Sequence, residues 1–389
     1  MNSLLESTKQ IGSFISQYIE QEETNRRLSK PVLNALREIG LHRLFLPKSL
    51  GGLETDPVTT ATLVEEVASH NTAAGWSMMV ANVSTWWCSR LSEEGIRELY
   101  KNGDHTLIAG AFHPPMMATV VKGGYSIKGR SPLTSNVHEA NWIFVTALIM
   151  ENEQVKMKEG RPDVIGVFMN AANCQIIDTW FTLGMKASDS NDIEANDVFV
   201  PNHLSFALNP DFQPNSFFKG PLYRFSAIGA SIACLIAPIA LAVARNAIEE
   251  VKSLAGKKTS FGTIAPLRER GSIQRKLGIA KALVMSSRAY LYNTLTESWS
   301  KCQAGEKLLL DEKADLLLAS AHTNQSCLQA VDHMYSAAGT TALYLRNKLA
   351  HYFADAQVIR QHGFANDSRY ETAAQVYLGL QPDLAVLIF

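Results

Sequence analysis

Residues 331–362 read VDHMYSAAGTTALYLRNKLAHYFADAQVIRQH, and this stretch carries the strongest structural signal in the chain. Val331 and Met334 stand at helical spacing, the letters AGTT then mark a helix stop, and a second apolar face follows over 349–356. A loop of small residues carries little side-chain bulk, so a flat ligand can approach its backbone closely. The stretch therefore predicts two buried helices joined by a small-residue loop, with His362 just beyond the second helix.

Length and composition are those of a large globular protein. The chain has 389 residues, 46% of them hydrophobic, and its 36 basic residues nearly balance 37 acidic ones. The near-neutral charge gives no electrostatic case for binding nucleic acid. Five scattered cysteines without a CxxC motif indicate reduced thiols and a cytoplasmic location. The first residues lack a signal-peptide pattern, and the apolar run over 228–243 is interrupted by Ser231 and Pro238, so we expect a core helix and no membrane span.

The hydrophobic pattern divides the chain into three parts. Residues 1–110 show three-to-four spacing and predict a helical domain, including a helix over 31–39 that Ser29 can cap. Residues 111–205 carry β-branched and aromatic runs between turns, which predict a β-barrel or sandwich. Residues 220–389 return to long helical runs and predict a four-helix bundle. The expected fold is therefore α+β and mostly α.

Single elements follow from the same patterns. A hairpin is predicted over 119–128 around the turn letters KGG, and further strands over 142–150, 164–169 and 191–200. The long run over 225–254, rich in Ala, Ile and Leu, predicts one continuous buried helix.

The C-terminal stretch resembles the acyl-CoA dehydrogenase superfamily, and most closely its group D two-component flavin-dependent monooxygenases, the hydroxyphenylacetate hydroxylase-like oxygenase components. In that group a small-Gly-small loop precedes an L-x-R-x-x-R-D segment and then a histidine. Leu349, Asp355 and His362 match this pattern. His351 and Ala354 stand where the group has arginines.

The resemblance covers nearly the whole chain and implies the helix–β–helix order predicted above. It also implies a homotetramer, and the apolar helix over 225–243 has few charges to present to water. The implied cofactor is reduced FMN or FAD, supplied by a separate flavin reductase that binds transiently. The implied co-substrate is O2, and no metal is implied.

One candidate site segment is GRSPLTSNVHEANW at 129–142, which resembles the superfamily's G-x-K-x-W-I-T-N motif. The resemblance implies that the Ser135 hydroxyl faces the reactive nitrogen edge of the flavin, with Asn136 beside it. Leu133 stands in the family's tryptophan position. Taken alone, Ser135 and Asn136 are typical of a turn between strands, and the wider resemblance favours the flavin contact.

A second candidate segment is AGAFHPPM at 109–116, where the family has a flavin-contacting loop. Phe112 and His113 can flank the ring, while the two prolines that follow fix an extended path. A proline-rich boundary between domains explains the same letters equally well.

Further cofactor contacts are implied by two more matches. Trp180 and Ser188 lie in a segment like the family's W-x-x-x-G-M-x-x-S-x-S, where hydroxyls and backbone N–H groups can hold flavin or phosphate oxygens. Lys258 and Phe261 resemble R-x-x-F-G, whose arginine holds the flavin phosphates of a neighbouring subunit. Lysine keeps the charge without the bidentate fork, which predicts looser flavin binding. Gly339 belongs to the small-residue loop.

Two observations separate oxygenation from dehydrogenation. The neutral imidazole of His362 can act as a base on a phenol or a ring N–H, although a histidine after a helix also serves as a C-cap. An acyl-CoA dehydrogenase needs a carboxylate base, and the family's two positions for it, within 339–344 and 223–228, contain no acid here.

The sequence therefore predicts a flavin-dependent monooxygenase that uses reduced flavin and O2 on a small aromatic substrate such as a phenol or an indole derivative, for example indole-3-acetate. His362 and Ser135 are the expected catalytic residues. The expected pocket residues are Asn82, Trp86, Trp87 and Phe112. An acyl-CoA dehydrogenase with bound FAD and a non-catalytic flavin-binding or scaffold protein remain alternatives.

Overall fold

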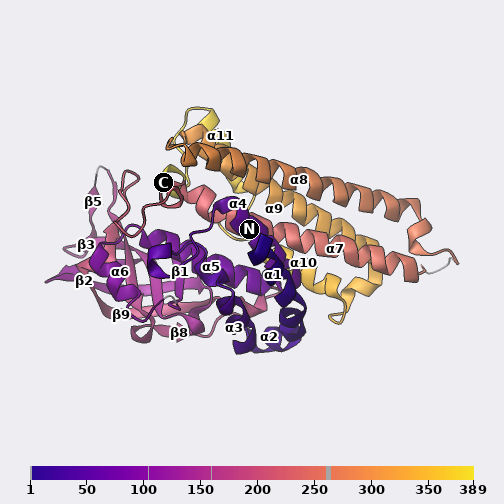
Figure 1. The fold of residues 1–389 in the computed structure, drawn as a ribbon, viewed down its shortest axis with the longest axis horizontal. Coiled ribbons are helices and arrows are strands. Elements are labelled where there is room, and N and C mark those ends of the chain that lie inside the picture. Colours follow the sequence, from indigo (N-terminus) through magenta and orange to yellow (C-terminus); the bar gives the residue numbers. More distant parts are fainter. Residues whose placement is uncertain (1, 104, 159, 260–263) are drawn as a thin grey trace.

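The computed structural model describes residues 2–103, 105–158, 160–259 and 264–389, without the side chains of residues 2, 113 and 114. Figure 1 shows an elongated molecule, with a sheet at one end, long parallel helices extending to the other, and the first helices packed between them. This arrangement confirms the predicted α+β fold and the helix–β–helix order along the chain.

Six α-helices precede the sheet in the described residues. The Asp56 carboxylate and the Asn71 amide oxygen accept backbone N–H bonds and so cap the two central helices of this group. Ser29, which we expected to cap a helix, instead donates both its hydroxyl and its backbone N–H to the carboxylate of Glu22, at 2.7 and 2.8 Å. The helices are α1 (Asn2–Ile15), α2 (Ile19–Asn25), α3 (Lys30–Glu38), α4 (Pro57–His70), α5 (Thr72–Cys88) and α6 (Glu93–Leu99).

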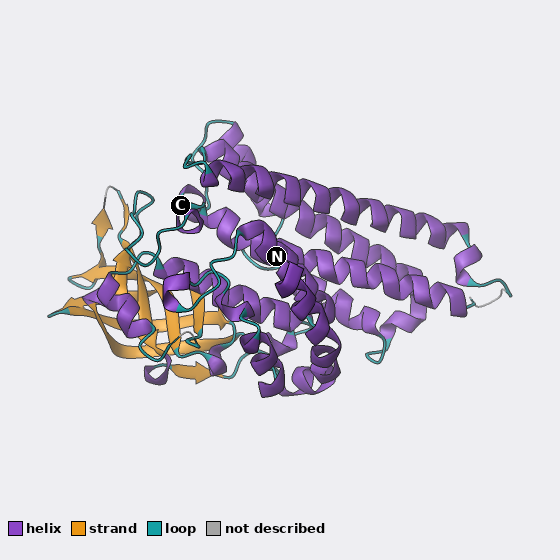
Figure 2. Cartoon of the chain, viewed as in Figure 1, coloured by secondary structure: helices purple, strands orange, loops and turns teal. Residues whose placement is uncertain are grey.

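The strands form one eight-stranded sheet in the order β10-β7-β3-β1-β2-β9-β8, with β4 paired to β3 (Figure 2). The predicted hairpin is present as β1 and β2, whose last pair joins Val121 to Gly124. Strands β1 and β3 are parallel, and the other pairs are antiparallel. The members are β1 (Ile108–Val121), β2 (Gly124–Thr134), β3 (Trp142–Glu151), β4 (Gln154–Val155), β7 (Val164–Asn170), β8 (Gln175–Ile177), β9 (Asn191–Pro201) and β10 (Ser205–Ala207), beside a separate ribbon of β5 (Met157–Lys158) and β6 (Arg161–Pro162).

The C-terminal third is the predicted helical bundle. Helix α9 packs against α7, α8 and α10, and Figure 1 shows α7, α8 and α9 running along the long axis of the molecule. Helix α10 ends at Ile359, so His362 lies in the following turn, where its backbone N–H bonds to the Ile359 carbonyl at 3.1 Å. The helices are α7 (Ala237–Lys257), α8 (Gly271–Gln303), α9 (Leu310–Ala338), α10 (Lys348–Ile359) and α11 (Ser368–Tyr377).

The run that we expected to be one continuous α-helix over 225–254 changes its geometry. A π-helical segment, Ile228–Ile236, precedes α7, and the N–H of Ala237 bonds to the carbonyl of Ile232. Pro238 lacks an N–H group and cannot continue a regular hydrogen-bond ladder, which explains the wider turn before it. The helix Ile228–Lys257 is long and apolar enough to cross a membrane, but 94% of its most apolar window is buried, so it is a core helix.

Helix α5 joins the layers of the fold. All of its residues except Val83 are buried, and it contacts both strand β1 and the π-helical segment. Because it lies between sheet and bundle, its side chains can reach the β-domain loops on one side and the C-terminal helices on the other. This helix carries Trp76, Asn82, Trp86 and Trp87.

Candidate functional site

A chain of buried hydroxyl groups lies where β2 ends and β9 begins. The indole N–H of Trp76 donates to Oγ of Ser135 at 3.0 Å, and Oγ of Ser190 lies 2.7 Å from both Ser135 and Ser188. All three serines are buried. Three hydroxyl hydrogens serve only two contacts among these oxygens, so at least one O–H has no acceptor among the described residues and can donate to a ligand.

Strained loop residues hold these hydroxyls in place. Asn136 and Asp189 both have left-handed backbones, with φ of 60° and 53°. The Asn136 N–H donates to the Ser188 carbonyl at 3.0 Å, which ties the two loops together. The Asp189 carboxylate accepts from the backbone N–H and from Nδ1 of His138, at 3.0 and 2.7 Å. Non-glycine residues adopt such backbones mainly where surrounding bonds enforce them, and they cluster at functional sites.

Trp180 bonds to residues on both sides of the loop that carries Ser188 and Ser190. Its indole N–H donates to the Met185 carbonyl at 3.1 Å and its backbone N–H donates to the side chain of Asn191 at 3.0 Å. Trp180 is buried, and both of its N–H groups donate hydrogen bonds within the chain. Any contact with a cofactor is therefore made through its ring.

His362 joins the hydroxyl chain through Trp76. The two rings meet edge to face with centroids 5.4 Å apart, and the ring of Phe364 lies 5.5 Å away on another side. The backbone N–H of Phe364 donates to Nδ1 of His362 at 3.3 Å. Burial lowers the pKa of His362 to about 4, so the imidazole is neutral near pH 7. With Nδ1 accepting, the hydrogen sits on Nε2, which presents a donor in this geometry.

The aromatic residues expected to line a pocket form a continuous group. Trp87 contacts Trp86 at 5.0 Å and Phe112 at 5.4 Å between ring centroids, and Phe112 lies 6.3 Å from Phe364. The predicted pocket residues therefore reach the surroundings of His362. The structure describes the backbone of His113, whereas its side chain lies outside the described part.

Asn82 has a different position from the one expected of a pocket residue. Its two N–H groups donate to the carbonyls of Leu41 and Met78, both at 2.8 Å, and its side-chain oxygen accepts from the N–H of Phe45 at 3.0 Å. The side chain is fully buried. Asn82 thus links the 41–45 segment to α5 by hydrogen bonds, and both of its side-chain N–H bonds are already engaged.

Lys258 and Gly339 lie together, away from the hydroxyl chain. The Lys258 ammonium donates to the Ala338 carbonyl at 2.7 Å and to the hydroxyl of Thr341 at 2.5 Å. Gly339 has φ 59° and ψ −142°, a backbone that only glycine adopts easily. Lys258 follows α7 at the end of the bundle remote from the sheet (Figure 1). Phe261 lies outside the described residues.

The two positions on α10 where the family has arginines are held by His351 and Ala354. His351 places Nδ1 2.9 Å from the Glu23 carboxylate and Nε2 2.5 Å from the Leu345 carbonyl, so both nitrogens act as donors. The bond to Glu23 raises the pKa of His351 to about 9, and the cation is kept. At the other position, the backbone of Ala354 packs closely against Gly184, where a Cβ would lie 2.3 Å from the Ala354 carbonyl carbon.

Asp355 is the buried anchor of the same helix. Its carboxylate accepts from the backbone N–H of Met185 at 2.7 Å, which links α10 to the loop that carries Ser188. Burial raises the pKa of Asp355 to about 6. It borders a cavity of about 650 Å³, which is lined mainly by α2, the junction of α4 and α5, and α10.

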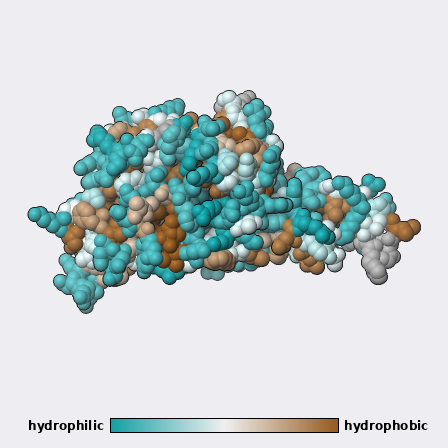
Figure 3. Space-filling model, turned by 90° about the horizontal axis from the view of Figure 1, so that it is seen from below, coloured by the Kyte–Doolittle hydropathy of each residue, from teal (hydrophilic) through white to brown (hydrophobic). Residues whose placement is uncertain are grey.

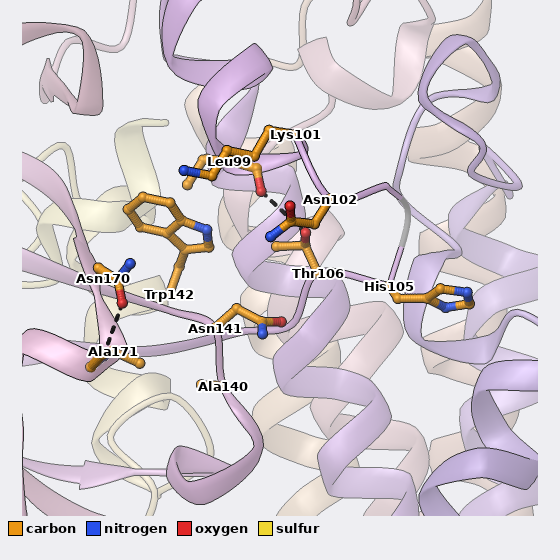
Figure 4. A pocket seen from close by; sticks show the side chains of 11 residues that line it. Leu99, Lys101, Asn102, His105, Thr106, Ala140, Asn141, Trp142, Asn170 and Ala171 are labelled. Carbon is orange, nitrogen blue, oxygen red and sulfur yellow. Dashed lines mark hydrogen bonds between the residues drawn. The ribbon is translucent and has the colours of Figure 1, made fainter.

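A second cavity, of about 340 Å³, opens between the end of α6, the segment before β1, the start of β3 and the end of β7 (Figure 4). Trp142, Asn141 and Thr106 are among its lining residues, and Asn141 uses its side-chain oxygen to accept the N–H of Leu107 at 2.8 Å. None of our predicted site residues lines this cavity. The hydroxyl chain and the aromatic group remain the candidate site.

The residues present fit a flavin. The unused O–H of the hydroxyl chain suits a ring nitrogen or carbonyl, since both accept hydrogen bonds. Leu133, two residues before Ser135, is 61% exposed and has a left-handed backbone. Its apolar side chain is therefore available to pack against a flat ring. The buried Thr134 hydroxyl has no hydrogen-bond partner among the described residues. We take these groups as the wall that would hold the ring.

Three contributors were not predicted. Trp76 lies on a helix far upstream in the sequence, and His138 and Asp189 come from two different loops. For His138 and Asp189 the only signal in the sequence was their place within the matched segments around Ser135 and Ser188, and for Trp76 there was none. A hydrogen bond between distant segments leaves no local pattern in the sequence.

Comparison with known proteins gives a consistent result. Residues 8–100 match the model described as "Acyl-CoA dehydrogenase, N-terminal domain", and residues 234–367 match "Acyl-CoA dehydrogenase, C-terminal domain". An indole-3-acetate monooxygenase from Pseudomonas putida is 28% identical over 363 residues, which cover 92% of this chain and 90% of that protein. The flavin-dependent monooxygenase oxygenase subunit HsaA from Rhodococcus jostii is 25% identical, covering 90% of each.

Solved structures agree on the fold. XiaF from Streptomyces sp., in complex with FADH2 and glycerol, aligns with a TM-score of 0.90 and 21% identity over 98% of this chain and 96% of that one. TdsC from Paenibacillus sp., with FMN and indole, aligns with a TM-score of 0.78 and 15% identity over 97% and 98%. With the two family matches at either end and relatives along nine-tenths of its length, the chain belongs to the acyl-CoA dehydrogenase superfamily.

Proposed function

We propose that this protein is the oxygenase component of a two-component flavin-dependent monooxygenase acting on a small aromatic substrate, such as a phenol or an indole derivative. The observation that carries the proposal is the buried hydroxyl chain with an unused donor, joined through Trp76 to the neutral imidazole of His362. Similarity to an indole-3-acetate monooxygenase supports the same class of chemistry.

Each residue has a distinct part in the proposed reaction. Bound reduced FMN or FAD supplies the electrons that activate O2, so that one oxygen atom enters the substrate and the other leaves as water. Ser135 orients the ring by its hydroxyl, and Trp76 fixes that hydroxyl by donating to it. His362 holds the substrate through the N–H at Nε2, the donor that remains because Nδ1 accepts from the backbone of Phe364. The rings of Trp87 and Phe112 exclude water from the reacting atoms.

The dehydrogenase alternative lacks its base. Removal of a proton next to a thioester needs a carboxylate in reach of the substrate. The 339–344 segment contains no acid, and Asp189, which lies beside the hydroxyl chain, is already bonded to His138. The family's other position for the base, within 223–228, contains no acid either.

We also propose a homotetramer in which a neighbouring subunit completes the cofactor site. Lys258 and Gly339 lie at the outer end of the bundle, where they can serve the flavin phosphates of another copy. The adjoining residues Leu343, Tyr344 and Leu345 are 65%, 54% and 72% exposed. Figure 3 shows apolar patches on a mainly polar face, which a subunit contact would cover.

Our proposal for the setting is a cytoplasmic enzyme that meets its reductase only briefly and binds neither nucleic acid nor a membrane. Five free cysteines support a reducing compartment. A net charge of −1 gives no attraction to nucleic acid or to an anionic membrane surface.

Anaerobic mixing of the protein with reduced FMN or FAD, followed by oxygenated buffer and indole-3-acetate or a phenol, tests the proposal. The expected result is an oxygenated aromatic product that depends on the protein, on reduced flavin and on O2. A yellow protein that is bleached by an acyl-CoA would instead establish a dehydrogenase. Failure to bind either reduced flavin would favour a non-catalytic binding or scaffold protein.

A further inference from the structure

Arg90 has an unusual environment for a charged side chain. It follows α5, and all three of its guanidinium nitrogens are buried without a hydrogen-bond partner among the described residues. Arg90 takes part in none of the ion pairs among the described residues. Burying a cation without an acceptor is costly, so a native structure that retains one calls for a ligand or ordered water to complete it.

Aromatic rings surround the guanidinium. Its central carbon lies 3.7 Å from the ring centroid of Phe212, 4.3 Å from that of Trp86 and 4.4 Å from that of Trp87. These ring faces stabilise a cation, but they offer no lone pairs in the geometry that N–H donors need. Burial lowers the pKa of Arg90 to about 9, so the group stays positively charged at neutral pH.

The aromatic group connects this cation to the candidate site. Trp87 lies against Arg90 and against Phe112, and Phe112 lies beside Phe364, which contacts His362. Phe112 and Phe364 are only partly buried, unlike Trp87. An apolar ring that packs against Phe112 would therefore lie one tryptophan ring away from Arg90.

We propose that Arg90 binds the carboxylate of the substrate, and hence that the enzyme takes aromatic carboxylic acids whose ring packs against Trp87 and Phe112. This inference rests on the proposed function and narrows its substrate class. A carboxylate matches the guanidinium fork with parallel N–H donors, which a neutral group cannot do.

Equilibrium binding to the full-length protein tests this assignment by isothermal titration calorimetry. The probes are indole-3-acetate, its neutral amide and acetate alone. The wild-type protein should bind the acid about 10- to 100-fold more tightly than the amide, the range for a hydrogen bond between charged groups. Acetate should bind far more weakly than the aromatic acid, because it lacks the ring.

Two variants and a control locate the effect. Arg90→Gln should weaken binding of the acid by about 10- to 100-fold and leave the amide unchanged, while Arg90→Lys, which keeps the charge without the fork, should fall between them. Arg97→Gln is the matched control, since Arg97 is 65% exposed and already paired with Glu93 at 2.8 Å. Circular dichroism checks that each variant is folded, and Arg90→Lys stands in if Arg90→Gln does not fold.

Equal binding of acid and amide by the wild-type protein would overturn the inference, as would an undiminished affinity in Arg90→Gln or no binding of either aromatic. Competition by acetate at the affinity of the aromatic acid would leave only a general anion site and would also overturn the inference.

Measurement of turnover separates this inference from the proposed function. Oxygenation of neutral aromatics as fast as acids keeps the proposed function and rejects the role of Arg90, whereas Arg90-dependent acid binding without oxygenation does the reverse.

Discussion

The indole N–H of Trp76 donates a hydrogen bond to the hydroxyl of Ser135 over 3.0 Å, and the same indole meets the ring of His362 edge to face. One side chain of α5 thus touches both residues that we assign to the chemistry. Because Trp76 fixes the Ser135 oxygen as an acceptor, the Ser135 hydrogen must point elsewhere, toward Ser190 or a ligand.

Replacing Trp76 with Phe tests this relationship. The variant keeps an aromatic ring but removes the donor, so we expect a loss of about 0.5–1.5 kcal/mol in the free energy of unfolding. Oxygenation per reduced flavin consumed should also fall, because the Ser135 hydroxyl can now turn. Trp299→Phe is the control, since Trp299 is a buried tryptophan of α8. Equal coupling in the two variants would mean that Trp76 only fills space.

The role of His362 is resolved by two substitutions. If it is a base, His362→Ala and His362→Gln should both lower oxygenation by roughly 10²- to 10⁴-fold and release hydrogen peroxide instead. If it acts through the N–H at Nε2, His362→Gln should retain much of the activity, because the amide is also a donor. If His362 only interacts with the end of α10, replacing it should lower the free energy of unfolding by ~1 kcal/mol and leave turnover unchanged.

The pH dependence of oxygenation gives an independent check on His362. Its pKa is lowered from 6.5 to about 4, so the neutral ring should persist as the pH falls through 6. The rate in wild-type protein should therefore not drop near pH 6.5 on account of this residue. The unfolded chain takes up the proton first, so His362 should make the folded state less stable as the pH falls from 6.5 toward 4.

The bond between His351 and Glu23 should stabilise the fold in a pH-dependent way. The pKa of His351 is raised from 6.5 to about 9, so its contribution is complete below about pH 6.5 and is lost as the pH rises through 9. We expect His351→Gln to lower the free energy of unfolding by about 1–2 kcal/mol at pH 6.5, and by less at pH 10. Urea unfolding at both pH values measures this, with Glu23→Gln as the matched variant. A pH-independent difference would contradict the ion pair.

Lys258 should set the affinity for flavin. We expect the protein to bind oxidised flavin loosely and reduced flavin more tightly, and Lys258→Arg to tighten both by restoring a fork for phosphate. Lys258→Met should weaken binding and also loosen the end of α9, because the ammonium bonds to the Ala338 carbonyl at 2.7 Å. Equilibrium dialysis and light scattering measure flavin affinity and the expected tetramer. Stoichiometric FAD retained through dialysis, or a monomer at micromolar concentration, would argue against this assignment.

The sequence by itself determined the order of helical and β-structured parts, because hydrophobic periodicity is a local property of the chain. It placed the β1–β2 hairpin and the helices around residues 331–362, and it led to Ser135 and His362 through matched segments. It missed the π-helical turn before Pro238, since that geometry depends on how a buried helix packs.

Tertiary structure decided which side chains meet. It joined Trp76 to Ser135 and Asp189 to His138, and it gave Asn82 and Ser29 internal partners that sequence reasoning did not foresee. Such hydrogen bonds connect positions far apart in the chain, so no periodic or local signal encodes them. The same reason applies to Arg90: its sequence neighbours are ordinary, and only folding buries the guanidinium without an acceptor in the part of the chain that the structure describes.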